Sequence, residues 1–195
     1  MVCKQLGRIG TVVKFAILLG FYGMLRQSNL APPNPKTFDP HRHTCRGDVF
    51  LHPPGLVILI KWSKCNQRRE SQQVIPIAQM PGHPLCPKQA YIDMLADTPN
   101  QDPNSPLLQI PGKPLGKSKS PFTVSQLRVC FTTIMDSLCY NHKQYSLHSL
   151  RRGGATLAFK AGVSYIHIKR HGGWASDAFW QYITTARFQV HWQSI

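Results

Sequence analysis

Four side chains in the C-terminal part of the chain could act together on a phosphate group. His148 and Arg151 are three residues apart, so on a helix they lie one turn apart and can face the same point. Trp174 and Tyr182 follow on later elements. A guanidinium can hold two phosphate oxygens, an indole N–H is a hydrogen-bond donor, and a phenol near a base and strong cations can act as a nucleophile. The set predicts phosphoryl transfer on DNA or RNA.

Each of these residues also has an ordinary structural interpretation. A His-x-x-Arg pair is common by chance, and Trp174 and Tyr182 fit equally well as aromatic residues of a core. On these residues alone, the catalytic and the structural interpretation both stay open.

The composition indicates a folded protein that binds a polyanion. The 195 residues include 23 Lys and Arg but 8 Asp and Glu, which gives a net charge of +15, and 42% are hydrophobic. Disordered basic tails lack that much hydrophobic sequence. The charge gathers at both ends, with +8 over 1–70, +1 over 71–136 and +6 over 137–195. Nucleic acid is therefore the first expected partner and an acidic membrane surface the second.

The cysteines and the apolar N-terminal run favour an intracellular protein with free thiols. None of the six Cys has C-x-x-C spacing. The run FAILLGFYGML is not followed by a small-x-small cleavage site, and it is shorter than the roughly 20 residues that cross a bilayer. We therefore expect no membrane partner.

A zinc site is a weak alternative. His41, His43 and Cys45, with Cys86, could supply ligands, but no second pair has zinc-finger spacing. We therefore expect no metal and no other cofactor.

The hydrophobic pattern predicts a mainly helical chain with one small antiparallel sheet, an α+β fold. Thr123 and Gln126 form a capping-box signature, and Ser164 and Ser176 are expected N-caps. Residues 97–121 are rich in Pro, Gly, Ser and Lys and predict a flexible loop within a single domain that spans 1–195. The expected helices are 11–26, 88–95, 123–139, 150–161, 164–172 and 177–183, and the expected strands are 56–62, 72–77 and 107–110.

Three stretches of the chain together resemble the tyrosine recombinase (phage integrase) family. HSLRRGGATLAFKAGVSYIHIKRHGGWASDAFWQYI (148–183) resembles its C-terminal box, and G-G-W-x-S-D-A-F-x-x-Y-I is similar to the DIRS-like and Crypton-type recombinases of eukaryotic mobile elements. FYGMLRQSNLAP (21–32) resembles the first arginine motif, and IKWSKCNQ (60–67) the strand and turn that present a lysine. The resemblance implies the catalytic-domain fold of this family over nearly the whole chain.

The resemblance also implies how a phosphate would be bound. Arg26 and Arg151 would clamp the scissile phosphate and offset the charge of its transition state. His148 would hydrogen-bond the phosphate and help to accept the phenolic proton, and Trp174 would donate its indole N–H. The two arginines supply the positive charge, so the resemblance implies no metal.

The remaining two residues would make and release the covalent bond. Tyr182 would attack phosphorus and form a 3′-phosphotyrosyl bond, and Lys64 would protonate the leaving 5′-oxygen. Lys64 is expected in a loop between two strands, and Arg26 at the end of an apolar helix from which its charged head can emerge. The expected activity is therefore DNA integration or recombination by cleavage and rejoining.

The chain departs from the family pattern in several places. Asn29 stands three residues after Arg26, where an acidic residue is often found. Tyr182 follows Trp174 by eight residues, as in the mobile-element branch, and it is favoured over Tyr165, which lies before Trp174. We expect no N-terminal DNA-clamping domain before Arg26 and a short tail after Tyr182.

The partners expected are double-stranded DNA and further copies of the chain assembled on it, in a nucleus, and no small-molecule substrate. Basic side chains, with Lys117 and Lys119 nearby, are expected to contact the DNA backbone; they are Arg68, Arg69, Arg152, Lys169 and Arg170. Two alternatives are a truncated or domesticated remnant that binds DNA without cutting it, and a basic chromatin-type protein whose affinity depends on salt alone.

Overall fold

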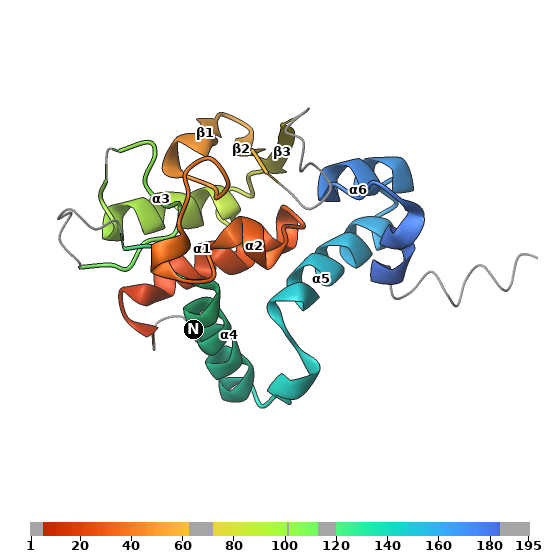
Figure 1. Ribbon diagram of the computed structural model, residues 1–195. Coiled ribbons are helices and arrows are strands. Elements are labelled where there is room, and N and C mark those ends of the chain that lie inside the picture. Colours follow the sequence, from red (N-terminus) through yellow and green to blue (C-terminus); the bar gives the residue numbers. More distant parts are fainter. Residues whose placement is uncertain (1–5, 63–71, 101, 113–119, 184–195) are drawn as a thin grey trace, which may run out of the picture.

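The computed structural model describes residues 6–62, 72–100, 102–112 and 120–183. These ranges form a mainly helical fold with a three-stranded antiparallel sheet, as the sequence predicts (Figure 1). Short 3-10 helices include η5 (Asp177–Tyr182). The α-helices are α1 (Ile9–Tyr22), α2 (Gln27–Leu30), α3 (Pro87–Asp97), α4 (Val124–Ser137), α5 (Leu147–Lys160) and α6 (Tyr165–Gly172), and the strands are β1 (Val49–His52), β2 (Gly55–Ile60) and β3 (Gln73–Ala78).

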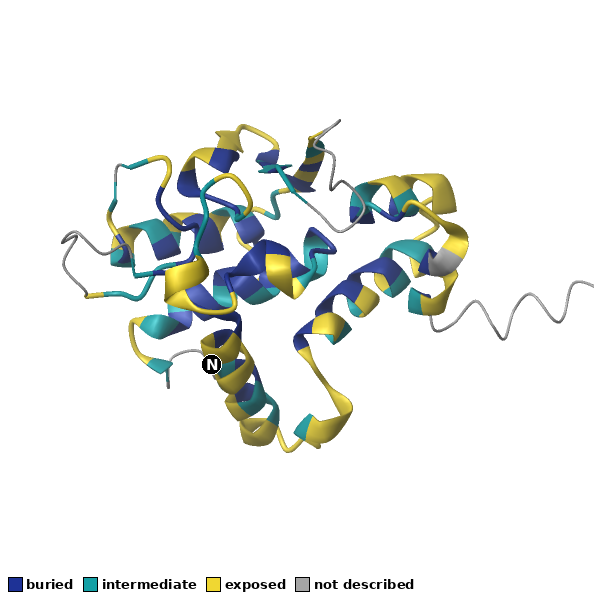
Figure 2. Cartoon of the chain, in the orientation of Figure 1, coloured by how far each residue is buried: buried dark blue, intermediate teal, exposed yellow. Residues whose placement is uncertain are grey.

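Helix α1 is the centre of the main core. It contacts α3, α4 and α5, and its residues are buried or intermediate, with the buried ones in the majority (Figure 2). Val12, Val13, Phe15 and Leu19 are fully buried. A helix that is apolar on nearly all sides is stable only where other elements cover it. The sequence of α1 therefore explains why α3, α4 and α5 gather around it.

The sheet has the order β1-β2-β3, so β2 is central and β3 forms one edge. Leu56 of β2 pairs with Leu51 of β1 and with Ile77 of β3. Successive residues of a strand point to opposite faces, and in β3 Ile75 and Ile77 are buried while Pro76 is exposed. A proline is tolerated there because an edge strand does not need every ladder hydrogen bond.

A second, smaller core lies in the C-terminal part of the chain, where α5, α6 and η5 meet. It includes Trp174, which the sequence identifies as a candidate site residue. Its buried members are Met24, Ala155, Ile168, Trp174, Phe179 and Ile183. The candidate site is therefore built against a core of its own.

The first helix is shifted from its expected position. It begins at Ile9 with Arg8 as its N-cap, so Thr11 lies inside the helix and not at its N-cap; the Thr11 hydroxyl donates instead to Asp97 Oδ2 at 2.8 Å. It ends at Tyr22, and the backbone turns at Met24, whose φ is +49°. The expectation that Arg26 ends this helix is wrong, because Arg26 lies beyond the turn in extended conformation at the N-cap of α2.

The strand expected at 107–110 does not form. Two isolated bridges, Cys45 with Pro106 and Gln109 with Pro121, take its place. Leu107 and Leu108 are buried in the main core, so the described part of 97–121 is tied to the fold. Residue 101 and residues 113–119 lie outside the described residues, and flexibility of the whole loop stays a prediction.

The later helices agree with the sequence except at their ends. The Thr123 hydroxyl accepts from the Gln126 N–H, and the Gln126 side chain accepts from the Thr123 N–H, which confirms the capping box. Ser164 caps α6 as expected. The last expected helix is the 3-10 helix η5. None of the helices in the described ranges is long and apolar enough to cross a membrane.

Candidate active site

The first turn of α5 carries His148 and Arg151. The helix begins at Leu147, three residues before its expected start at Leu150, because Ser146 and Ser149 form a capping box in which Ser149 Oγ accepts from the Ser146 N–H at 3.0 Å. This earlier start puts His148 on the helix. His148 and Arg151 are therefore one turn apart on the same face, as the spacing predicts.

Arg151 is the largest of the fully buried side chains in the described ranges, with 1% of its surface exposed. Its Nη1 donates to the carbonyl oxygens of Met24 and of Gly172, the latter at 2.8 Å. The guanidinium carbon lies 3.7 Å from the centre of the Trp174 ring and 5.6 Å from that of Tyr182. Backbone carbonyls and aromatic faces thus stabilise a buried cation whose position is fixed from several sides.

Helix α5 approaches the end of α1 closely because of Gly154. A Cβ at this position would lie 2.0 Å from the carbonyl oxygen of Phe21, so no other residue fits without a shift of the helices. This close approach brings Arg151 to the turn after α1, where the carbonyl of Met24 accepts its hydrogen bond. Close packing of α5 against the end of α1 therefore explains why Gly154 of the R-R-G-G-A-T stretch is a glycine.

Arg26 lies near this cluster and is half-buried. Its backbone carbonyl accepts from the Asn29 N–H at 2.9 Å, which begins the short helix α2. The positive charge of Arg26 contributes to lowering the pKa of His148. Electrostatically, Arg26 therefore belongs to the same site as His148 and Arg151.

The surroundings of His148 favour its neutral form. Partial loss of solvation lowers its pKa most, and the charges of Arg151, Arg152 and Arg26 lower it further. Its ring centre lies 5.0 Å from that of Tyr182, in an edge-to-face arrangement. A neutral imidazole beside a phenol can accept the phenolic proton, as general base catalysis requires.

Trp174 is placed by the two glycines before it. A Cβ at Gly172 would lie 1.8 Å from the Trp174 ring, and Gly173 adopts the left-handed conformation that ends α6, with φ +66°. The indole packs over Gly172, 5.1 Å from the ring centre of Tyr182. Trp174 is 7% exposed, and its Nε1 has no hydrogen-bond partner among the described residues. A buried donor without a partner is costly unless a ligand uses it.

Tyr182, at the end of η5, completes the cluster. It is half-buried, and its ring lies against His148, Trp174 and Arg151. Its backbone carbonyl accepts from Thr156 Oγ1 at 3.0 Å. Thr156 is a residue that sequence reasoning missed as part of the site, although it is the threonine of the R-R-G-G-A-T stretch.

The structure thus brings together four of the residues predicted from the sequence, His148, Arg151, Trp174 and Tyr182, and places Arg26 beside them. Lys64, the expected general acid, lies outside the described residues. So do the expected DNA contacts Arg68 and Arg69.

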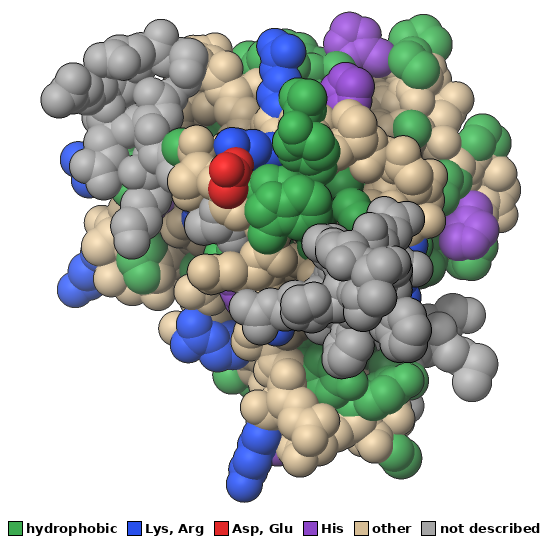
Figure 3. All heavy atoms as spheres, turned by 90° about the vertical axis from the view of Figure 1, so that its right-hand side faces the viewer, with side chains coloured by type: hydrophobic (Ala, Val, Ile, Leu, Met, Phe, Trp, Pro, Cys, Tyr) green, Lys and Arg blue, Asp and Glu red, His purple; other side chains and the backbone are tan. Residues whose placement is uncertain are grey.

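The remaining expected DNA contacts lie on the outer surfaces of α5 and α6. Arg152 and Arg170 are exposed. Lys169 differs, because its Nζ forms an ion pair with Asp177 Oδ1 at 2.7 Å. On the face of the molecule shown in Figure 3, basic and hydrophobic side chains lie side by side and acidic ones are scarce. A polyanion approaching this face meets little repulsion.

Asn29 stands where the family pattern often has an acidic residue, and it has a structural role. Its side-chain amide donates to the carbonyl oxygen of Trp62 at 3.0 Å, and its backbone carbonyl accepts from the Thr44 hydroxyl at 2.8 Å. The first bond ties the helical turn after Arg26 to the residues that follow β2, and the second ties it to the loop at 39–48. Asn29 therefore links the Arg26 turn to the part of the chain that leads to Lys64.

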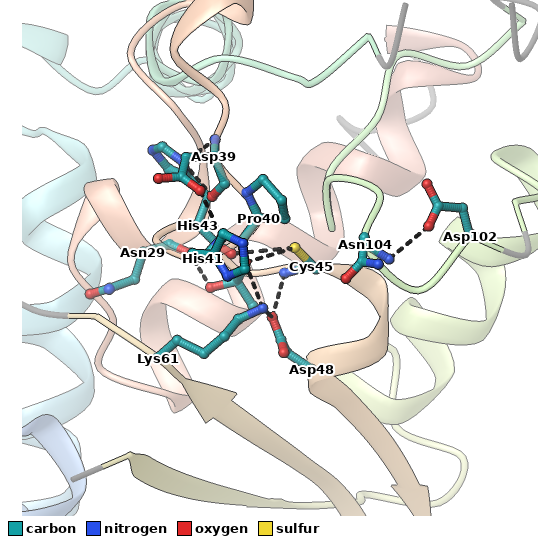
Figure 4. A network of polar contacts seen from close by, with 11 residues as sticks. Asn29, Asp39, Pro40, His41, His43, Cys45, Asp48, Lys61, Asp102 and Asn104 are labelled. Atoms are coloured by element: carbon teal, nitrogen blue, oxygen red, sulfur yellow. Dashed lines mark hydrogen bonds and ion pairs between the residues drawn. The ribbon is translucent and has the colours of Figure 1, made fainter. Parts of the chain in front are cut away.

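A lysine close to Lys64 in sequence is committed to the fold. Lys61 Nζ forms an ion pair with Asp48 Oδ2 at 2.8 Å and donates to the Pro40 carbonyl oxygen at 2.7 Å (Figure 4). Asp48 in turn accepts from the backbone N–H of Cys45 at 2.7 Å. Lys61 thus anchors the end of β2 to the loop at 39–48.

The weak zinc alternative gains no support in the described ranges, where no three His, Cys, Asp or Glu residues are grouped as metal ligands would be. His43 Nδ1 lies within hydrogen-bond distance of the Asp39 backbone, and its ring stacks on Phe38 at 5.7 Å. Cys86 is the N-cap of α3. His43 and Cys86 thus have structural roles in separate parts of the fold.

No protein-family model and no curated protein matches the chain. Among solved structures, it is similar to the XerH site-specific recombinase bound to its difH substrate in a pre-cleavage complex, with a TM-score of 0.61 and 15% identity over 97% of this chain and 47% of the recombinase. A post-cleavage complex of XerH with a palindromic difH substrate gives a TM-score of 0.62 and 13% identity over 96% of this chain and 47% of that one.

A transposon enzyme has the same fold. The Tn1549 transposon integrase, in complex with a circular intermediate DNA, gives a TM-score of 0.52 and 14% identity over 93% of this chain and 58% of the integrase. The chain therefore spans about half the length of the recombinases that it matches. At these identities the likeness concerns the fold, and the described chain has the fold of a tyrosine recombinase catalytic domain.

Proposed function

We propose that the chain cuts and rejoins DNA through a tyrosine nucleophile. The observation that carries the proposal is the meeting of His148, Arg151, Trp174 and Tyr182 around one point, with a buried indole N–H that has no partner in the described ranges. If Trp174 and Tyr182 served only to fill a core, they would not require a histidine of lowered pKa and a buried guanidinium beside them. These features favour the catalytic interpretation of the four residues over the structural one.

The first step would transfer the DNA phosphate to the protein. Tyr182 Oη attacks phosphorus, its proton passes to His148, and the bond from phosphorus to the 5′-oxygen breaks. Lys64 supplies the proton that the leaving 5′-oxygen takes up. Arg26, Arg151 and the Trp174 N–H stabilise the negative charge on the non-bridging oxygens as it grows. The step exchanges the ester bond to the 5′-oxygen for one to Tyr182 Oη, so the number of phosphoester bonds is unchanged and rejoining by a 5′-hydroxyl is the same step in reverse.

The net charge of +15 and the outward position of Arg152 and Arg170 support double-stranded DNA as the substrate. The resemblance to DIRS-like and Crypton-type recombinases is the support for a mobile-element origin, a nuclear location and self-association on DNA. The XerH and Tn1549 proteins were solved with DNA bound, which agrees with this choice of substrate.

A suicide substrate tests the nucleophile. The target sequence is unknown, so the probe is a library of nicked duplexes with randomised sequence in which the cleaved fragment diffuses away and the adduct is trapped. The expected result is a protein–DNA adduct that survives denaturant and is lost in Tyr182→Phe. Tyr165→Phe is the matched control, because Tyr165 is an exposed tyrosine of the same C-terminal part, on α6.

The outcomes separate the candidate functions. An adduct that persists in Tyr182→Phe means that another residue is the nucleophile. DNA binding with no adduct, and with Arg26→Ala and Arg151→Ala binding more weakly, indicates a remnant that has kept its phosphate site. Binding that is unchanged in these two variants and varies with salt alone indicates a basic chromatin-type protein.

A further inference from the structure

A pocket lies on the outward face of α5, beside the candidate active site. Its volume is about 450 Å³. The residues of α5 that line it recur three or four positions apart, as on one face of a helix, and the segment just before the helix also contributes to it. Its polar lining residues are Gln144, Tyr145, Ser149, Arg152, Thr156 and Lys160. Because most of these side chains are exposed, a ligand can reach the pocket from solvent.

Two cations line this pocket, and within the described residues neither is paired with a carboxylate. Arg152 and Lys160 are exposed, and none of the ion pairs formed in the described ranges includes them. No Asp or Glu is among the described residues that line the pocket. Lys169, on the neighbouring helix α6, differs in this respect, because it forms an ion pair with Asp177. The positive charge of the pocket is therefore available to an anion from solution.

Neutral hydrogen-bonding groups line the pocket together with these cations. The side-chain amide of Gln144 and the hydroxyl of Tyr145 can both donate. Ser149 Oγ accepts from the Ser146 N–H at 3.0 Å, and a hydroxyl that accepts one hydrogen bond can still donate another. A guanidinium, an ammonium group and several neutral donors together fit the oxygens of a phosphate group.

The pocket adjoins the candidate active site at two points. His148 and Arg152 are four residues apart on α5, which places their Cβ atoms about 5–6 Å apart, and the charge of Arg152 contributes to lowering the pKa of His148. Thr156, which lines the pocket, donates from its Oγ1 to the Tyr182 carbonyl oxygen at 3.0 Å. Successive phosphates of one DNA strand are about 3.4 Å apart along the duplex axis. A phosphate one or two steps from one bound between His148 and Tyr182 is therefore within reach of Arg152.

We infer that this pocket is a second phosphate subsite, which binds a phosphodiester of the DNA backbone one or two steps from the phosphate that is attacked. The inference rests on the proposed function for the position of the first phosphate. Arg152 supplies the main contact, because it is the pocket cation nearest to His148. Lys160 lies eight residues further along α5, or about 12 Å, and extends the positive charge along the strand. The subsite adds affinity and holds the strand in register with the site, without taking part in the attack.

Removal of single phosphate charges tests the subsite. The probe is the duplex recovered with the suicide assay, in intact form, with one neutral methylphosphonate at each of the three phosphates on either side of the scissile one, in either strand. Affinity is measured in Tyr182→Phe protein, which lacks the proposed nucleophile, with and without Arg152→Gln. Arg8→Gln is the matched control, because Arg8 is also an exposed arginine but lies at the opposite end of α1 from Tyr22.

At one flanking position, the methylphosphonate should weaken binding about tenfold, as the loss of a hydrogen bond to a charged group does. In Arg152→Gln the same methylphosphonate should weaken binding by less than about twofold, because the contact is already lost. In Arg8→Gln the tenfold loss should remain. A full loss at every sensitive position in Arg152→Gln overturns the inference, and so does a scan in which no flanking position is sensitive.

The salt dependence of binding tests the subsite without any cutting. The probe is a short duplex of arbitrary sequence. Each phosphate contact contributes about 0.9 to the slope of log K against log salt concentration, so the slope should be smaller by about 0.9 in Arg152→Gln and unchanged in Arg8→Gln. An unchanged slope in Arg152→Gln, or an equal fall in Arg8→Gln, overturns the inference whether or not the protein cuts DNA. If the parent protein forms no adduct but the slope falls in Arg152→Gln alone, the proposed function fails and the pocket remains a phosphate-binding site.

Discussion

The guanidinium carbon of Arg151 lies 3.7 Å from the centre of the Trp174 ring, and both residues are almost completely buried. A desolvated cation on an aromatic face contributes up to about 2 kcal/mol. The face of the indole thus contacts a buried cation, while its N–H has no partner in the described ranges and is the donor that the proposed function assigns to the phosphate. Substitutions at these two positions can separate the cation contact from the donor.

Trp174→Phe should keep the aromatic face and remove the donor. We expect the rate of adduct formation to fall by about 10²-fold to 10³-fold, as when one donor to a transition-state oxygen is removed. The melting temperature should fall as well, because Phe is smaller than the buried indole and leaves a cavity, so the rate is measured well below it. Trp174→His returns an N–H and should recover part of the rate. A Phe variant with the parent rate on the suicide substrate would show that the indole N–H does not contact the phosphate.

Arg151 should be essential to activity but replaceable for folding. Arg151→Ala leaves a cavity and takes a donor from the carbonyls of Met24 and Gly172, so we expect the free energy of unfolding to fall by about 3 kcal/mol. Arg151→Met fills the volume without a buried charge and should cost less than about half as much. Neither variant should form an adduct. Urea unfolding together with the suicide assay separates these effects, and an active Met variant contradicts the phosphate-clamp role.

The rate of adduct formation should depend on the protonation of His148. Loss of solvation and the neighbouring cations lower its pKa below its ordinary value of 6.5, so the imidazole stays neutral and able to accept a proton at neutral pH. We expect the rate to fall on acidification with a midpoint below 6.5. In His148→Ala the rate should be lower by on the order of a hundredfold, and this acid limb should be absent. An unchanged acid limb in the Ala variant would assign it to another group.

The free energy of unfolding should also decrease at acidic pH, because of His171. Burial is the main cause that lowers the pKa of His171, and its hydrogen bond to the Tyr22 carbonyl opposes the shift without cancelling it. The unfolded chain therefore binds more protons than the folded protein as pH falls below 6.5, and the free energy of unfolding decreases until pH passes the folded pKa. Thermal unfolding between pH 5 and 7.5 should show this slope, and His171→Asn should reduce it. An equal slope in that variant would exclude His171 as a source.

The sequence predicts the local features of this site well. The three-residue spacing of His148 and Arg151 places them on one helix face, and the Thr123 box, the Ser164 cap and the Gly172–Gly173 helix end all depend on neighbouring residues. Such features depend on residues that are close together in the chain, so a single sequence is enough to predict them. The prediction of a strand at 107–110 is wrong because these apolar residues are buried as part of a loop that packs on the core. The apolar pattern of such a loop looks the same in the sequence as that of a strand paired in a sheet.

The long-range contacts of the site are not visible in the sequence. The bond from Arg151 to the Met24 carbonyl depends on the turn after α1 and on the close approach of Gly154 to Phe21. The bond from Gln73 to the end of α6 joins residues almost a hundred positions apart. Such contacts arise from tertiary packing, and glutamine or asparagine side chains carry no pattern that shows where their amides will bind.

The hydrogen bond from Thr156 reaches Tyr182 through the main chain and leaves the phenol untouched. This hydrogen bond therefore does not depend on the side chain at position 182. Tyrosine analogues with fluorinated rings could be installed there without loosening the end of η5, so that the acidity of the attacking hydroxyl becomes an adjustable quantity while the surrounding geometry stays constant.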